Sequence, residues 1–470
     1  MRRNVKMILI GGALAISLGG FAQNLPIIQT KYTADPIPMV YNDTVYLYTS
    51  HDEDNATGFL MKDWLLYKSV DMVNWTECGP VASLKNFRWA TDVRGGQGGG
   101  FDNGAWASHV IERNGKFYMY CTVHKRGIGV LVSNTPYGPF KDPIGKPLVE
   151  GKHIDPAAFI DDDGQAYLYW GNPNLWYVKL NKDMISVDGK PRHDPSMEKK
   201  RGKKDPFFYQ EGPWAYKRNG KYYMTYASKC CPEGIGYAMS NSPLGPWKFA
   251  GYIMEGDERS SGNHPGIIDF KGKTYVFGFN YTILRQTMAE KYERRSVSVA
   301  EMKFNNDGTI VKLPFWEDQK KGVEQIGTFN PYRQVEAETM AYSEGLKSDI
   351  TSIWKRDPVT KKRKKIATFR FITSVHNGDF MMLKGVDFAK GCSEMDFRVA
   401  PLSKSIVEIR IDKKNGPLIG TLKLNRSGEG DVWRTVTTKV KRTTGVHDLY
   451  FVFKGEKELL NFDWWYLKKK

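Results

Sequence analysis

The stretch Asp205-Pro-Phe-Phe-Tyr-Gln-Glu-Gly-Pro-Trp-Ala-Tyr-Lys-Arg-Asn-Gly-Lys-Tyr-Tyr-Met-Thr-Tyr226 decides the fold. Asn219-Gly220 lies between two alternating apolar runs, and this dipeptide in that setting is a strong signal of a β-hairpin. Pro213 is compatible with the start of a strand but not with its middle, because proline cannot donate to a sheet ladder. The stretch therefore predicts a strand that opens at Glu211, a hairpin turn and a second, aromatic strand.

The same pattern occurs five times along the chain. The other four copies begin at Asp35, Trp106, Asp155 and His264, and a further strand follows each hairpin. The hairpin turns begin near residues 42, 114, 163, 219 and 271, a spacing of roughly 50 to 70 residues. Sheet repeats of about this length pack radially as the blades of a β-propeller. We therefore expect an all-β chain whose residues 23–310 form a five-bladed β-propeller.

The residues that open the five hairpins should meet at one place, because the first strand of each propeller blade lines the central axis. Three of them are carboxylates, and a buried carboxylate is costly unless it is paired or hydrogen-bonded. Strand-start residues can simply cap backbone groups, but perturbed carboxylates gather at functional sites. We interpret the convergence as an active site. Its members are Asp35, Trp106, Asp155, Glu211 and His264.

These residue types suit the cleavage of a glycosidic bond. That reaction needs an acid at the leaving oxygen and a base or nucleophile on the opposite face of the sugar, and Glu211 and Asp35 supply such a pair. Asp155 can raise the pKa of the acid by like-charge repulsion. Trp106 could stack on a sugar ring. His264 could be a base, a hydrogen-bond donor or a contact of a metal-bound water.

The repeat is absent from the last third of the chain. Residues 311–333 read as a connector, and residues 334–470 contain short strands of alternating polarity, such as Ser405–Ile411 and Leu418–Leu424. This pattern predicts a β-sandwich.

The N-terminus indicates export. Residues 1–22 have the charged start, short apolar run and small-residue end of a secretory signal peptide. No other stretch is long and apolar enough for a membrane-spanning helix. We therefore expect a secreted or periplasmic monomer without a membrane span.

The charge pattern and the cysteine spacing limit which partners and bound groups the sequence predicts. The formal net charge is +17, but the basic runs fall in separate loops without a nucleic-acid motif, so we expect no nucleic-acid partner. The five cysteines follow no metal or disulfide spacing. Cys230-Cys231 could form a vicinal disulfide, but we expect two free thiols in a loop.

Three segments resemble the signature segments of glycoside hydrolase family 43. They are Thr33-Ala-Asp-Pro36, His153-Ile-Asp-Pro-Ala-Ala158 and Gln210-Glu-Gly-Pro213. The resemblance covers residues 30–305 and implies a five-bladed propeller that inverts the anomeric centre. It implies Asp35 as general base, Asp155 as pKa modulator and Glu211 as general acid. Inversion requires room for a water, so the acid and the base should lie about 6.5 to 9.5 Å apart.

Two further segments extend this resemblance. Ser261-Gly-Asn-His264 resembles the segment whose histidine contacts a central calcium through water and helps to bind substrate. Arg295 best matches a substrate-contacting arginine. The opening segment looks most like the arabinoxylan arabinofuranohydrolase branch, which implies removal of α-L-arabinofuranosyl side chains from arabinoxylan or a related plant polysaccharide. A β-D-xylosidase of the same chemistry and a catalytically silent glycan-binding protein remain the alternatives.

The C-terminal part resembles carbohydrate-binding module family 6. The resemblance implies Trp433 and Asn461 as sugar-binding residues. It implies a structural calcium site made by Glu336, Glu338 and Asp463. The second stacking aromatic of that family falls on Ser374, so a bound sugar loses a ring contact worth on the order of 1 kcal/mol.

Overall fold

The computed structural model describes residues 26–90, 103–198, 206–288, 292–426, 428 and 432–468. The expected signal peptide, Met1–Ala22, lies outside the described residues. Within them the regular structure is almost entirely β, as the sequence predicts. The one α-helix there is α1 (Thr282–Thr287), and three-residue 3-10 turns occur at η1 (Leu84–Asn86), η2 (Arg88–Ala90) and η4 (Trp316–Asp318). No helix of the described part has the length and apolar character needed to cross a membrane.

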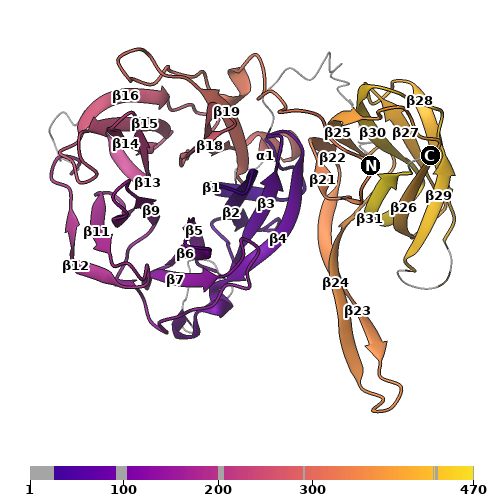
Figure 1. The fold of residues 1–470 in the computed structure, drawn as a ribbon, viewed down its shortest axis with the longest axis horizontal. Coiled ribbons are helices and arrows are strands. Elements are labelled where there is room, and N and C mark those ends of the chain that lie inside the picture. The colour runs from indigo at the N-terminus through magenta and orange to yellow at the C-terminus, as the bar shows by residue number, and fades with distance from the viewer. Residues whose placement is uncertain are drawn as a thin grey trace, which may run out of the picture.

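Five antiparallel sheets occupy residues 32–302, and within each sheet the strands pair in chain order (Figure 1). The strands are β1 (Tyr32–Tyr41), β2 (Thr44–Asp52), β3 (Asp63–Ser69) and β4 (Trp75–Ser83); β5 (Ala105–Arg113), β6 (Lys116–Val123), β7 (Gly127–Ser133) and β8 (Val149–Glu150); β9 (Ala157–Ile160), β10 (Ala166–Trp170), β11 (Trp176–Leu180) and β12 (Val187–His193); β13 (Tyr209–Arg218), β14 (Lys221–Ser228), β15 (Gly234–Ser240) and β16 (Lys248–Met254); and β17 (Gly266–Phe270), β18 (Lys273–Asn280) and β19 (Ser296–Met302).

The first strands of these sheets lie next to one another at the centre of the arrangement. β1 contacts β5, β5 contacts β9, β9 contacts β13, β13 contacts β17, and β17 contacts β1. Figure 1 shows the five sheets placed radially around this centre. Residues that open the first strands are therefore brought close together.

The tight hairpin turns explain why the sheets form where the sequence indicates. Both residues have positive φ at Asn42-Asp43, Asn114-Gly115, Asn219-Gly220 and Lys271-Gly272. This is the conformation of a type I′ turn, whose twist matches that of the two strands it joins and which favours asparagine and glycine.

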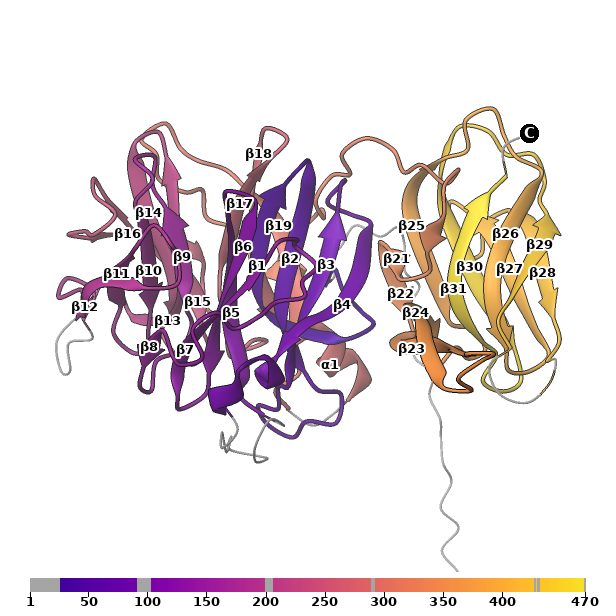
Figure 2. The same ribbon diagram turned by 60° about the horizontal axis from the view of Figure 1, so that its bottom comes forward.

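Two further sheets form the C-terminal part (Figure 2), and their buried apolar side chains form one continuous core. One has the order β23–β24–β31–β26–β29, with β20 beside β31, and the other has the order β22–β25–β30–β27–β28. The strands of these two sheets are β20 (Val335–Glu336), β22 (Tyr342–Glu344), β23 (Lys347–Arg356), β24 (Arg363–Thr373), β25 (Phe380–Asp387), β26 (Glu394–Pro401), β27 (Ser405–Ile411), β28 (Leu418–Leu424), β29 (Arg434–Lys439), β30 (Val446–Gly455) and β31 (Leu460–Leu467), and β21 (Thr339–Met340) belongs to neither.

The two parts of the chain are joined by more than a linker. β21 pairs with β4, the outer strand of the first sheet. Ser348 Oγ donates a hydrogen bond of 2.7 Å to the buried Glu77 Oε2. Lys347 forms an ion pair of 2.8 Å with Asp54 in the loop between β2 and β3. The start of the β23–β24 hairpin therefore packs against the first sheet.

The segment expected to be a plain connector contributes to the core of the first part. Phe315 and Trp316 are buried in the same apolar cluster as Trp214 and Ile267. Trp316 is 0% exposed, and its Nε1 donates a 3.2 Å hydrogen bond to Asn263 Oδ1.

Replacing Trp316 by alanine should destabilise the radial sheets strongly. Removing a fully buried tryptophan side chain costs about 3 to 5 kcal/mol of unfolding free energy, since the cavity left behind collapses only in part. Urea unfolding followed by fluorescence measures the loss. Trp354→Ala is the matched control, because Trp354 is 49% exposed on β23. Equal stability losses for the two variants would contradict a core role for Trp316.

Candidate active site

A cavity of about 380 Å³ lies where the first strands meet. The five residues that the sequence places at the axis, together with the predicted substrate contact Arg295, line it: Asp35, Trp106, Asp155, Glu211, His264 and Arg295. Asp35, Trp106 and Glu211 belong to β1, β5 and β13, whereas Asp155, His264 and Arg295 directly precede β9, β17 and β19. The openings of the strands thus converge as the repeat pattern predicts.

Backbone irregularities aim the carboxylates into the cavity. Asp35 has φ of 48° and lies in a bulge between Ala34 and Ile37. Glu211 lies between two register shifts of the β13–β14 pair, and bulges of this kind re-aim side chains next to active sites. Gly212 has φ of +58°, and a Cβ at this position would lie 2.7 Å from His264 Cγ. Glycine is therefore required beside Glu211.

His264 connects the carboxylates. Its Nδ1 lies 3.2 Å from Asp35 Oδ1, its Nε2 lies 3.1 Å from Glu211 Oε1, and Nε2 lies 4.0 Å from Asp155 Oδ2. Burial lowers the pKa of His264, but the three carboxylates outweigh burial and raise it to about 10. An imidazolium at the axis therefore separates Asp35 from Glu211 by the width of its ring and two short contacts.

Arg295 fixes the charge of Asp35. Its Nη1 lies 3.1 Å from Asp35 Oδ1, while Nε and Nη2 donate a bidentate pair of hydrogen bonds of 2.9 and 2.8 Å to Asp52. Burial raises the pKa of Asp35, but Arg295 and His264 outweigh burial, so the pKa lies below its usual value. Asp35 is thus held as a carboxylate.

The pKa values of Asp155 and Glu211 are shifted in opposite directions. Burial, opposed by His264 and assisted by the charges of Glu211 and Asp35, raises the pKa of Asp155 to about 8. Burial also raises the pKa of Glu211, but contacts from His264 and Asn172 outweigh it and bring the pKa below its usual value. The proton of this group therefore lies on Asp155 when the cavity holds no sugar. Like-charge repulsion read from the sequence predicts a raised pKa on Glu211, whereas the imidazolium beside Glu211 lowers it and the raised pKa falls on Asp155.

Trp106 forms an aromatic wall of the cavity. Its ring lies 3.8 Å from the ring of His124 and 6.0 Å from that of Phe59, measured between centroids. Its Nε1 is buried without a hydrogen-bond partner. The ring can face a sugar, and the indole N–H is available to donate to a hydroxyl.

Sequence reasoning missed several residues that line the cavity or support it. Asp52 anchors Arg295, and Asn172 Nδ2 donates a hydrogen bond to Glu211 Oε2. Tyr281 donates to Glu293 Oε2 and lines the cavity with it. Asp52 ends β2, while Asn172 and Tyr281 directly follow β10 and β18. The end of a second strand lies beside the opening of the first in an antiparallel pair, so this position was the signal that could have found them.

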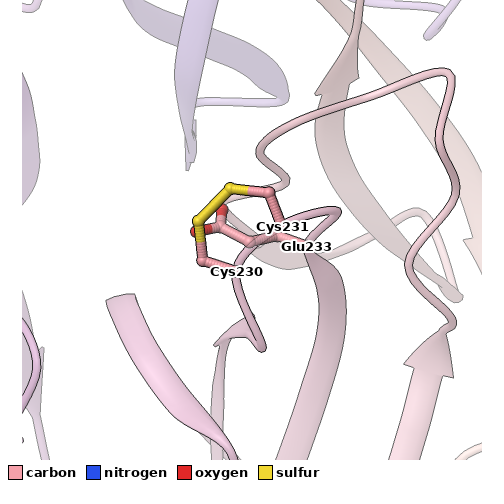
Figure 3. A group of neighbouring side chains, drawn as sticks. All are labelled: Cys230, Cys231 and Glu233. Atoms are coloured by element: carbon pink, nitrogen blue, oxygen red, sulfur yellow. A yellow bond between two sulfur atoms is a disulfide. The ribbon is translucent and has the colours of Figure 1, made fainter.

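Cys230 and Cys231 form a disulfide, contrary to the expectation of two free thiols. Both residues line the cavity, next to the buried Glu233 (Figure 3). Sequence spacing could not decide this point, because a bond between adjacent cysteines depends on the backbone at the end of β14. Cys78, Cys121 and Cys392 are free.

The cavity offers a donor set for a cation. Asp155, Glu211 and His264 place ligand atoms within 4.8 Å of one another. The three carboxylates at the axis suit a divalent ion in charge, but Ca²⁺ takes six to eight oxygen ligands, so water would have to complete the set. The residues therefore fit a calcium ion that is reached in part through water.

The predicted calcium ligands of the C-terminal part do not form such a set. In the described residues, groups of three or more His, Cys, Asp or Glu with ligand atoms within 4.8 Å occur only at the cavity. Asp463 instead pairs with Arg398, whose positive charge takes the place an ion would have. Glu338 is buried with Oε1 unpaired, and Glu336 is exposed. This arrangement does not favour a calcium site on Glu336, Glu338 and Asp463.

The predicted sugar-binding residues of the C-terminal part lie apart from the cavity. Trp433 is half-buried, with ring centroids 5.1 and 5.3 Å from those of Phe369 and Phe371, and the Arg398 guanidinium lies over its face. Asn461 is 5% exposed, and its Oδ1 has no hydrogen-bond partner. Both residues remain predictions for sugar binding.

Comparison with known proteins gives two family matches. The model of glycosyl hydrolases family 43 matches residues 23–310, and that of carbohydrate binding module family 6 matches residues 350–469. An arabinoxylan arabinofuranohydrolase of Bacillus subtilis is 32% identical over 94% of this chain and 91% of its own length.

Solved structures give a consistent result. A family 43 arabinoxylan arabinofuranohydrolase from Bacillus subtilis, in complex with cellotetraose, superposes with a TM-score of 0.76 at 30% identity, covering 96% of this chain and 98% of the other. A β-xylosidase/α-arabinofuranosidase of the same family from a compost metagenome, a calcium-free form with xylotriose, has a TM-score of 0.54 at 28% identity, covering 62% and 97%.

Proposed function

Because this chain belongs to family 43 of the glycosyl hydrolases and carries a family 6 carbohydrate-binding module, we propose that it removes α-L-arabinofuranosyl side chains from arabinoxylan or a related hemicellulose, with inversion. The observation that carries the proposal is the set of three carboxylates around one cavity, held apart by His264. The named activity of the Bacillus subtilis relative, similar along nearly the whole chain, supports the substrate.

We also propose how the chain is divided into domains. The mutual contacts of β1, β5, β9, β13 and β17 support a closed five-bladed propeller over residues 23–310. Residues 311–333 connect the two parts while Phe315 and Trp316 pack in the core of the first, and residues 334–470 form the β-sandwich. Export through Met1–Ala22 fits a polysaccharide substrate.

Asp35 acts as the general base in this mechanism. Arg295 and His264 keep it ionised, so it can accept a proton from the water that attacks the anomeric carbon. The imidazole ring between Asp35 and Glu211 supports a separation in the range of about 6.5 to 9.5 Å that inversion requires.

Glu211 acts as the general acid, which requires that it hold a proton when the sugar is bound. A sugar hydroxyl that takes the place of the Asn172 amide at Glu211 Oε2 removes one of the contacts that lower the pKa of this residue. Burial and the charge of Asp35 then raise it. Asp155, which accepts a hydrogen bond of 3.2 Å from the Gly212 N–H, keeps the segment around Glu211 in place and holds the proton close by.

Calcium at the axis is part of the proposal. His264, through water, and the carboxylates beside it would hold the ion, which would supply positive charge to the centre of the propeller. The calcium-free form described for a related enzyme supports an ion in this family.

Removal of calcium should therefore destabilise the protein. An ion present at one hundred times its Kd contributes about 2.7 kcal/mol, so chelation by EDTA should lower Tm by about 5 °C. Differential scanning calorimetry measures the shift. Calcium added in excess should restore Tm, whereas magnesium should not. An unchanged Tm after exhaustive chelation would contradict an axial calcium ion.

One hydrolysis experiment tests the activity. The protein is incubated with arabinoxylan and the released sugars are identified, while aryl α-L-arabinofuranoside and aryl β-D-xyloside are assayed in parallel. Free arabinose supports the proposal. Xylose alone would establish the xylosidase, which the double activity named for the compost enzyme makes the second candidate. Binding of arabinoxylan without release of any sugar would establish a silent glycan-binding protein.

A further inference from the structure

The turn between β14 and β15 places side chains in the cavity wall that have no role in the proposed mechanism. Cys230, Cys231 and Glu233 come from this turn, and all three line the cavity that contains Glu211. Figure 3 shows the carboxylate of Glu233 beside the disulfide. The two sulfur atoms and a carboxylate oxygen lie within 4.8 Å of one another. A disulfide has no thiolate with which to ligate a metal, so this group is better suited to an organic ligand.

Glu233 is an unusual buried acid. It is 3% exposed, and its Oε2 is buried without a hydrogen-bond partner. In the described residues no lysine, arginine or histidine forms an ion pair with it. Buried polar side-chain atoms are nearly always paired, so an unpaired one in a cavity wall calls for a partner from outside the protein.

The neighbours of Glu233 shift its pKa upward. Burial and the nearby Glu211 raise its pKa to about 8, against His264 and a backbone N–H of Asn263, which lower it. A carboxyl group at this place can bond to a sugar hydroxyl in either protonation state, because it accepts when ionised and both donates and accepts when protonated.

The disulfide supplies the apolar half of the same wall. Both cysteines are exposed, and a disulfide offers two polarizable sulfur atoms without a strong donor or acceptor. A pentose ring has the complementary character, since its C–H groups need an apolar contact and its hydroxyls need hydrogen bonds at the edge.

We propose that the Cys230–Cys231 disulfide and Glu233 form a sugar subsite beside Glu211, in which a pentose ring packs on the two sulfur atoms and one of its hydroxyls hydrogen-bonds to Glu233 Oε2. The inference rests on the proposed function for the identity of the sugar. It assigns Glu233 to binding and leaves the proton transfers to Asp35 and Glu211.

Glu233→Met tests the carboxyl group. The variant keeps the side-chain length and removes the hydrogen bond, so KM for arabinoxylan oligosaccharides should rise about tenfold, which corresponds to about 1.4 kcal/mol, with a smaller change in kcat. Its Tm should stay close to that of wild type, because the loss of a buried carboxyl oxygen without a partner offsets the loss of the acceptor for the Asn263 N–H. Glu233→Gln, whose amide can still bond to a hydroxyl, should remain within about threefold of wild type.

Reduction tests the disulfide. Dithiothreitol supplies two electrons and two protons to open the bond into two thiols and is itself oxidised to a cyclic disulfide. KM should rise in the reduced protein and return to its first value on reoxidation. The variant Cys230→Ala/Cys231→Ala should have a raised KM that dithiothreitol does not change. Glu255→Gln, which alters an exposed carboxylate paired with Lys312, is the matched control for the Glu233 variants.

The outcomes separate the subsite from the activity. If wild type releases arabinose but Glu233→Met and the reduced protein keep the wild-type KM, the subsite is wrong and the function stands. A large fall in Tm for Glu233→Met would assign the residue to folding instead. If wild type releases no sugar, the function is wrong, and calorimetry with arabinoxylan oligosaccharides decides the subsite by whether Glu233→Met weakens binding.

Discussion

Replacing Glu211 by alanine should lower kcat/KM on arabinoxylan by about 10³- to 10⁴-fold, while the protein stays folded. The sugar oxygen that leaves is a poor leaving group without a proton, and a positioned acid contributes rate factors of about 10² to 10⁴. The fold should survive, because the main contacts of Glu211 are with His264 and Asn172 at the cavity and not with the apolar core.

The leaving group distinguishes loss of the acid from general damage. An aryl arabinofuranoside with a strongly acidic phenol leaves without protonation, so Glu211→Ala should lose far less activity on it than on arabinoxylan. Stopped assays on both substrates give the ratio. Glu255→Ala, at the surface beside Lys312, should match wild type on both. Equal losses on the two substrates would remove Glu211 from the acid role.

The fold could be predicted because its signals are local. Each hairpin is encoded by a short turn and its flanking aromatic strands, and in four of the five copies the turn has the positive φ values that such residues favour. Because the hairpin pattern occurs five times, it also predicts that the sheets pack radially. Trp316 escaped prediction because it packs in a core made by residues far away in sequence, and no periodic pattern marks it.

The site was only half predictable for a geometric reason. The openings of the first strands carry a recognisable residue each, and all of them line the cavity. The ends of the second strands lie at the same face, but their residues differ in type: Asp52, Asn172 and the Cys230–Cys231 disulfide. Their roles depend on partners across the cavity, such as Arg295 for Asp52 and Glu211 for Asn172. A single sequence does not show those pairings.

The pKa order of the carboxylates is a product of the same pairings. Like-charge repulsion alone would raise the pKa of Glu211, which is the direction that the sequence predicts. The structure adds His264 between the acids, and its positive charge favours the ionised forms of Asp35 and Glu211, leaving the proton on Asp155. Substrate binding must therefore change the surroundings of Glu211 before it can act as an acid.

Replacing Asp35 should abolish turnover by a different route. Asp35→Asn keeps the shape but cannot accept a proton from water, so kcat should fall by about 10³-fold or more on arabinoxylan and on activated aryl substrates alike. Arg295 keeps its bidentate contact with Asp52, so the cavity should retain its form. Circular dichroism and binding of arabinoxylan oligosaccharides check that the variant is folded.

Azide is a nucleophile that needs no deprotonation, so it can test whether Asp35 acts as the general base. In Asp35→Ala the space of the carboxylate is free, and azide can approach the anomeric carbon from the side on which water attacks. Azide should restore part of the turnover on an activated aryl arabinofuranoside and give an arabinosyl azide of inverted configuration, identified by NMR. The Glu211→Ala variant should give no azide product of retained configuration, since the face opposite the leaving group is the one that Asp35 borders. A retained azide product from Glu211→Ala, in which Asp35 is still present, would show that the reaction passes through a covalent intermediate with Asp35 as its nucleophile.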